Sequence, residues 1–174
     1  MGKLIISFIL LLFGIHMNLQ AEKSPSYLDM IQKINVQTAK EVKKELGLVA
    51  IGTGGALMYD VKMSAMSFQY YHEIDIEKGR ELIVKVIEKY LKNINENKPI
   101  RPYLHQYPFE VDSIEIRMFI SKPDGRDIPD GQLEYISCLH GIIEYNANGP
   151  KWKTITLKSE TFNEAVELLH AKHN

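Results

Sequence analysis

Three stretches of the chain repeat apolar residues at steps of three and four, which is the spacing of one face of an α-helix. The first covers residues 25–46, the second follows Asp75 and ends before Pro99, and the third follows Ser159. Asp75 and Ser159 are of the residue types that cap helix N-termini, so we expect each to begin its helix. Gly47 is expected to end the first helix, because glycine readily adopts the left-handed conformation found there.

Five further segments have the composition, the alternation or the flanking turn residues typical of strands. They are residues 48–51, 61–72, 111–120, 133–146 and 151–157. The alternation is clearest in residues 111–120, where isoleucines and a methionine share the face expected to point into the core. Glu115 and Arg117 then point away from it. The glycine-rich segment Gly52–Gly55 is expected to break the chain after the first strand.

The order of these elements is helix, two strands, helix, three strands, helix. Neighbouring strands are joined by turns or short loops, which favours antiparallel pairing. The helices are expected to pack chiefly on one face of the sheet. The sequence therefore predicts a single α+β domain, with a mainly antiparallel sheet of about five strands and three helices.

The first residues have the pattern of a secretory signal peptide. Lys3 precedes an apolar run of about 12 residues that ends at Ile15, and polar residues then lead to Ala21. The alternative is an uncleaved anchor, which the short run disfavours because a membrane-spanning helix needs about 20 residues. We therefore expect residues 1–21 to be removed on export and residues 22–174 to form the domain, in the periplasm or outside the cell.

Composition and charge are those of an ordinary globular domain. Of the 174 residues, 45% are hydrophobic and 25% are charged, which argues against a disordered or fibrous chain. The formal net charge is −1, and about −2 once Lys3 leaves with the signal peptide. Because no block of lysine and arginine occurs, neither nucleic acid nor, after signal cleavage, a membrane surface is an expected partner. No cofactor is expected.

Cys138 is the only cysteine, so no disulfide can form within the chain. A buried, inert thiol is expected, and a disulfide between two chains is the alternative. Cys138 and His140 lie two residues apart in the predicted strand 133–146 and are expected to share one face, either the outer face or one under partial cover. The expected core face carries Leu133, Tyr135, Leu139, Ile143 and Tyr145. Since two ligands are too few for a metal, no metal site is predicted.

The other residues with chemical potential do not form a recognisable catalytic set. His72 and Glu73 are adjacent on a strand, so they point to opposite faces. His170 and His173 share a helix end, where a histidine more often interacts with the helix dipole than with a metal. Gly52–Gly55 does not open into a helix, as a phosphate-binding loop must. No catalytic residue is therefore assigned.

The segment from Arg101 to Phe109 is rich in side chains that combine apolar area with a polar tip, the chemistry enriched at interfaces. Flanking prolines restrict it to extended conformations. We expect it to form a binding surface with the outer face of the sheet. The candidate binding residues are Arg101, Tyr103, His105, Tyr107, Phe109, Arg117 and His140. The alternative is a structural crossover, in which the aromatic residues cover the sheet edge and Arg101 caps the second helix.

This segment also carries a resemblance. The motif PYLH at residues 102–105, followed by YPF at residues 107–109 and preceded by SFQYY at residues 67–71, resembles a group of small uncharacterised exported bacterial proteins. The resemblance covers most of the chain after the leader. It implies no activity and supplies no catalytic residue.

The leading hypothesis is an exported, non-enzymatic domain that binds a protein or ligand partner. It requires scattered histidines and an exposed apolar patch. The alternative is a small periplasmic hydrolase, which requires His72, His105 or His140 to converge with partner side chains in a concave pocket. A third class, a chaperone-like module, requires an unpaired sheet edge that accepts a strand.

Overall fold

Six strands and three α-helices make up the part of the chain that the computed structural model describes, residues 26–173. The helices are α1 (Ser26–Leu46), α2 (Ile76–Glu96) and α3 (Phe162–His173). The strands are β1 (Val49–Ala56), β2 (Met63–Tyr70), β3 (Ile114–Ile120), β4 (Leu133–Leu139), β5 (Ile142–Asn148) and β6 (Thr154–Thr161). Short 3-10 helices cover Lys98–Tyr103, Val111–Ser113 and Pro150–Trp152. The predicted signal peptide, residues 1–21, lies outside the described residues.

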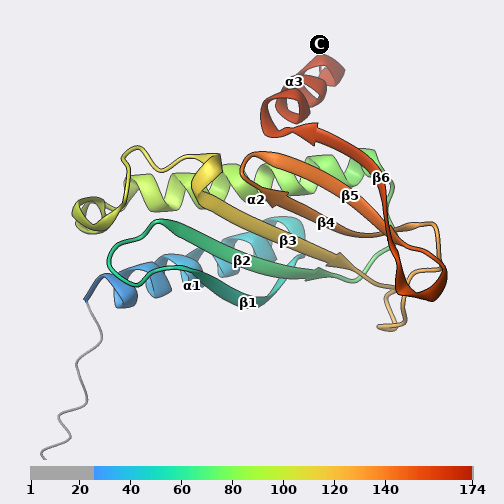
Figure 1. Ribbon diagram of the computed structural model, residues 1–174, viewed down its shortest axis with the longest axis horizontal. Helices are drawn as coiled ribbons and strands as arrows, with labels where there is room; N and C mark the ends of the chain where they lie inside the picture. The colour runs from blue at the N-terminus through green and yellow to red at the C-terminus, as the bar shows by residue number, and fades with distance from the viewer. Residues whose placement is uncertain (1–25, 174) are drawn as a thin grey trace, which may run out of the picture.

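The strands form one sheet in the order β1-β2-β3-β4-β5-β6 (Figure 1). Neighbours are antiparallel except β2 and β3, which are parallel. The helix α2 connects these two, because a parallel pair needs a crossover that returns the chain to its starting end. The predicted α+β fold with a mainly antiparallel sheet and three helices is confirmed, with six strands rather than five.

The additional strand arises because the chain reverses at His140 and Gly141. These residues have φ values of 48° and 71° and join β4 to β5 as a hairpin. A Cβ at position 141 would lie 2.9 Å from Oδ1 of Asp112, so the turn requires glycine. The prediction of one strand over residues 133–146 was wrong because the reversal uses His-Gly and not one of the common Asn-Gly or Asp-Gly turns.

The hairpin also corrects the predicted orientation of its side chains. Cys138 is buried in the core, whereas His140 is exposed on the turn, so the two do not share an outer face. Leu139 was expected in the core and is exposed instead. The predicted burial of Ile143 and Tyr145 is confirmed.

Two further predictions about element boundaries were wrong. Gly52–Gly55 does not break β1 but continues it, paired with β2, because glycine can still form the ladder hydrogen bonds. Ser159 lies within β6, and Thr161 caps α3. The Thr161 hydroxyl accepts a hydrogen bond from the Glu164 N–H (3.2 Å), and the Glu164 carboxylate accepts one from the Thr161 N–H (2.7 Å). This reciprocal pair is a capping box.

The predicted end of the first helix and the predicted start of the second agree with the structure, and the predicted start at residue 25 lies outside the described residues. Oδ1 of Asp75 accepts a hydrogen bond from the Lys78 N–H at 2.7 Å, which caps α2. Gly47 has a φ of 77° and its N–H donates to the Lys43 carbonyl at 3.1 Å, which ends α1.

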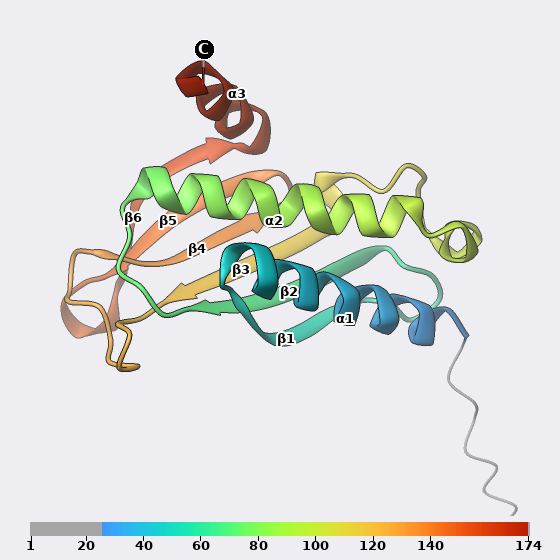
Figure 2. The same ribbon diagram turned by 180° about the vertical axis from the view of Figure 1, so that it is seen from behind.

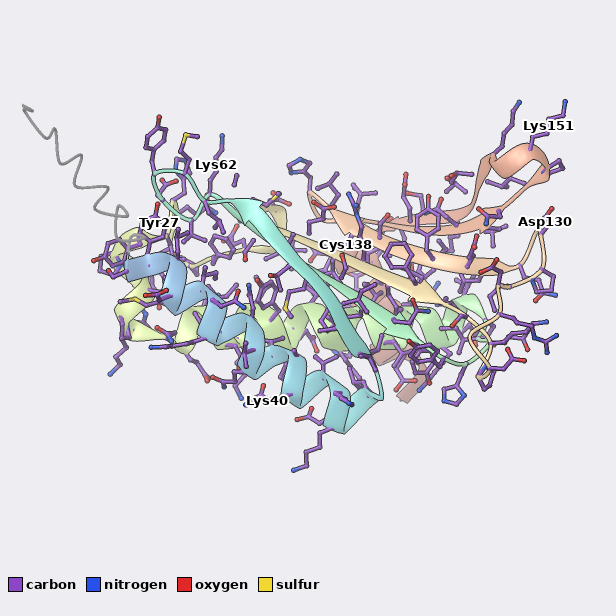
Figure 3. The ribbon with its side chains drawn as sticks, turned by 90° about the horizontal axis from the view of Figure 1, so that it is seen from below. Tyr27, Lys40, Lys62, Asp130, Cys138 and Lys151 are labelled. Atoms are coloured by element: carbon purple, nitrogen blue, oxygen red, sulfur yellow. The ribbon has the colours of Figure 1, made fainter. Side chains whose placement is uncertain are left out.

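The helices α1 and α2 lie side by side across one face of the sheet (Figure 2). The core between them and the sheet is apolar and includes Ile34, Val42, Phe68, Ile83, Ile87, Ile116, Met118 and Ile136. The helix α3 follows β6 and contacts α2. Within residues 26–173, no helix has the length and apolarity to cross a membrane. The opposite face of the sheet has no helix over it in this part of the chain (Figure 3).

Candidate functional site

The uncovered side of the sheet, here called the open face, arranges its outward positions in three rows that run across the strands. Strand register places Ser67, Arg117, Ser137, Glu144 and Ser159 in the central row. The row on one side contains Ala65, Glu115, Leu139, Ile142 and Thr161. The row on the other side contains Gln69, Phe119, Tyr135 and Thr156, with the buried Asn146 in register between the last two.

The central row carries charges of both signs. Nη2 of Arg117 lies 2.5 Å from Oε1 of Glu115, and the arginine side chain keeps 55% of its surface exposed. Glu144 is exposed and makes no ion pair with any other residue in the range 26–173. Ser137 separates Arg117 from Glu144 by two strand spacings, or about 10 Å. Arg117 thus has one carboxylate beside it on its own strand and a second two strands away in its own row.

The two outer rows expose large apolar side chains. Phe119 is 37% exposed, and Leu139 and Ile142 are each 42% exposed. The rings of Phe119 and Tyr135 lie with their centres 6.2 Å apart. Contiguous apolar groups of this kind on the surface of a domain are typical of a contact site.

These rows enclose a shallow hollow of about 640 Å³. Its lining is Glu115, Arg117, Phe119, Tyr135, Ser137, Leu139, His140, Ile142 and Glu144. A smaller hollow of about 270 Å³ lies next to it above β1 and β2 and shares Glu115 and Arg117 with it. The open face therefore presents one continuous concave surface around the Arg117–Glu115 pair.

The candidate binding residues of the sequence prediction divide between two places. Arg117 and His140 line the larger hollow, whereas none of the five candidates from the segment 101–109 lines either hollow. Phe109 is buried, and Asn95 near the end of α2 holds its backbone by two hydrogen bonds of 2.7 and 2.8 Å. Arg101 donates to the Asn95 carbonyl at 2.7 and 3.1 Å and lies 4.7 Å from the ring centre of Tyr107.

The middle of the same segment is tied to the connection between β1 and β2. Tyr103 stacks on Tyr27 of α1 with ring centres 5.5 Å apart. The Val61 N–H donates to the Tyr103 carbonyl (2.8 Å), and the His105 N–H donates to the Val61 carbonyl (3.1 Å). Nδ1 of His105 lies 2.7 Å from Oδ2 of Asp60. These contacts match the structural crossover more closely than a free binding loop.

Among the described residues, His72, His105 and His140 do not meet at a common site. His72 packs against the edge of Tyr70, with ring centres 5.2 Å apart, and His140 lines the hollow. His105 and Asp60 have the spacing of the histidine and aspartate of a catalytic triad. Both are exposed, and no nucleophile among residues 26–173 hydrogen-bonds to that histidine.

Cys138 is poorly suited to chemistry. Its side chain is fully buried, and burial raises the pKa of the thiol to about 12. The thiolate is the reactive form of cysteine, and very little of it is present at neutral pH. The described part of the chain also lacks any group of three histidine, cysteine, aspartate or glutamate side chains able to hold a metal.

The most buried charged cluster lies on the helix-covered side. Arg80 of α2 binds Glu160 of β6 through Nε (2.7 Å) and Nη2 (3.1 Å). Tyr145 donates to the same carboxylate at 2.6 Å, and Nζ of Lys158 lies 2.9 Å from it. Burial alone would raise the pKa of Glu160, but these hydrogen bonds outweigh it and hold the pKa below its usual value. The cluster joins α2 to the edge of the sheet.

Sequence reasoning missed Phe119, Tyr135, Leu139, Ile142 and Glu144 as site residues. Leu139 and Tyr135 were assigned to the core because the turn at residues 140–141 was not recognised. Phe119 had a readable signal, since it occupies an outward position of the predicted strand 111–120, where a polar residue is expected.

Comparisons with models of known protein families, with curated proteins and with solved structures found no match to this chain.

Proposed function

We propose that this chain is an exported, non-enzymatic domain that binds a protein partner through the open face of its sheet. The observation that carries the proposal is the hollow of about 640 Å³, in which exposed apolar side chains surround a mixed-charge row. Such a surface combines area that gains from leaving water with charges that set the orientation of a partner. Export is the expectation that the leader supports.

The rival, a histidine-centred hydrolase, has less support. It requires a base, a nucleophile and an oxyanion site around one pocket. His140 is the only histidine in the larger hollow, and Cys138 is buried on the other side of the sheet. The His105–Asp60 couple lies in neither hollow of the open face. The arrangement of these groups therefore favours binding over catalysis.

A chaperone-like module is supported only in part. The strands β1 and β6 lie at the two edges of the sheet, as strand addition requires. β1 contains three glycines and no charged residue, so an added strand would gain main-chain hydrogen bonds but few side-chain contacts. The open face offers much more side-chain chemistry for selecting a partner.

Site-specific photo-cross-linking in the native cell envelope tests the proposal. A photoreactive amino acid replaces Leu139 on the open face in one variant and Val36 on α1 in the other. The two positions are matched in exposure, at 42% and 43%. A defined adduct is expected from position 139 and not from position 36. Equal adducts from both positions, or none from position 139, would contradict the proposal.

The segment 101–109 provides a second comparison. Tyr103→Ala and His105→Ala remove side chains that were candidates in the sequence prediction and that lie outside the hollows. The adduct at position 139 is expected to persist in both variants. Its loss in both, with the fold intact by circular dichroism, would move the binding surface to the segment 101–109.

A further inference from the structure

Two charges of the open face lie at equal distances on either side of β4. Arg117 on β3 and Glu144 on β5 are both in register with Ser137 on β4. Each therefore lies about one strand spacing, roughly 4.8 Å, to either side of Ser137. A second copy can be placed over the open face by a rotation of 180° about an axis parallel to β4. The cation of each copy then lies opposite the anion of the other, which gives two ion pairs.

We infer that the partner of the open face is a second copy of this chain, bound face to face about a two-fold axis along β4. The inference rests on the proposed function, because it names the occupant of the same surface. In this arrangement β3 of one copy lies opposite β5 of the other. Arg117 of each copy then faces Glu144 of the other copy, and the small Ser137 faces its own counterpart.

The apolar side chains of β4 fit the same rotation. Tyr135 and Leu139 belong to β4, so each lies near the axis and faces its own counterpart. The same register places Phe119 of one copy opposite Asn146 of the other, and Ile142 opposite Glu115. Face-to-face packing of two sheets interdigitates side chains of this kind and removes them from water. The apolar contacts thus supply the driving force, and the charges fix the orientation.

Other occupants match the charges less well. Arg117 is already bound to Glu115, and Glu144 lies nearby, so a small anion meets more negative than positive charge. A strongly acidic partner would be repelled by the two glutamates, and a strongly basic partner would offer Arg117 no new carboxylate. A self-complementary contact needs both signs on a single surface, and the open face has both.

Sedimentation equilibrium tests the inference by measuring the oligomeric state of the purified chain, produced from the 174-residue sequence. Arg117→Glu alone and Glu144→Arg alone each place like charges in both contacts. Each is expected to weaken the dimer about tenfold or more. An equimolar mixture of the two variants restores opposite charges in both contacts of the mixed dimer. The mixture is expected to recover dimerisation to within about threefold of the unmodified chain.

Lys85→Glu on α2 is the matched control, because it reverses an exposed charge on the helix-covered side. It is expected to leave the dimer unchanged. A monomeric unmodified chain overturns the inference. A dimer that tolerates both reversals, or a mixture that does not recover, also overturns it. Arg117 and Glu144 are exposed, so the variants are expected to fold, and thermal melting by circular dichroism checks this.

The cross-linking experiment separates this inference from the proposed function. An adduct at position 139 with the mass of two copies supports both. An adduct with a different protein, together with a monomeric chain, supports the proposed function and overturns the inference. A monomeric chain that gives no adduct at position 139 overturns both.

Discussion

On the helix-covered face of the sheet Arg80 pairs with Glu160, and on the open face Arg117 pairs with Glu115. The shortest distances in the two pairs are similar, at 2.7 and 2.5 Å. Their surroundings differ, because the side chains of Arg80 and Glu160 keep only 8% and 4% of their surface exposed. The Arg117 side chain keeps 55% of its surface exposed, and the Glu115 side chain keeps 16%.

The contrast shows which charges serve the fold and which remain available. A buried pair must satisfy its partners completely, because removing one ion leaves the other without water and without a counter-charge. An exposed pair contributes about 0.2–1 kcal/mol and can exchange its partner for another. Arg80 and Glu160 therefore serve to join α2 and β6, whereas Arg117 can form an ion pair with a carboxylate of another molecule.

The largest expected effect is on stability when each arginine is replaced by methionine. Arg80→Met leaves Glu160 buried with Tyr145 and Lys158 as its remaining partners, so the free energy of unfolding is expected to fall by about 3–5 kcal/mol. Arg117→Met is expected to lower it by less than about 1 kcal/mol. Urea denaturation measures both. Equal losses of unfolding free energy in the two variants would contradict the proposed difference between the buried and the exposed arginine.

Neighbouring positions on β4 provide the next comparison, since Cys138 faces the core and Ser137 lines the open hollow. Iodoacetamide at pH 8 is expected to alkylate a Ser137→Cys variant about 100-fold faster than it alkylates Cys138. Burial and the raised pKa of the native thiol are the physical reasons. Mass spectrometry of dilute samples follows both reactions. Similar rates at the two positions would mean that the covered face opens readily.

Glycine-to-alanine substitutions on the two faces are expected to have opposite signs. A Cβ on Gly79 of α2 would lie 2.5 Å from Cδ1 of Ile136, so Gly79→Ala overpacks the core at a net cost of about 1 kcal/mol. A Cβ on Gly54 of β1 meets nothing within 4 Å, so Gly54→Ala is expected to stabilise the chain by about 0.5 kcal/mol. Thermal unfolding distinguishes the two, and a stabilising Gly79→Ala would contradict the expected crowding.

The smallest expected effect is a pH dependence that comes from the buried pair. The pKa of Glu160 is lower in the fold than its usual 4.5, so its stabilising contribution is fully present above that pH. The contribution is lost as the pH falls from 4.5 toward the lower pKa of the folded state. Urea midpoints from pH 6 to pH 3 are expected to decline more steeply for the unmodified chain than for Glu160→Gln. Parallel profiles would show that Glu160 does not titrate in this way.

The sequence predicted most of the covered face and little of the open one. The buried alternation of β3 and the apolar stripes of α1 and α2 were readable because each is a regular local pattern. Glu115 and Arg117 were placed outward for the same reason. The rest of the open face was missed, because Leu139 and Ile142 become cross-strand neighbours only after the chain reverses at Gly141.

Local chemistry alone determined where several elements begin and end. The capping aspartate at position 75, the Thr161-x-x-Glu164 box and the glycine that ends α1 each depend on residues within a few positions of one another. Only the tertiary structure decided that Arg80 meets Glu160, 80 residues away, and which face of the sheet stays uncovered. The reason is that contacts between distant segments depend on how the helices and the sheet pack together. The local periodicity of the sequence does not specify that packing.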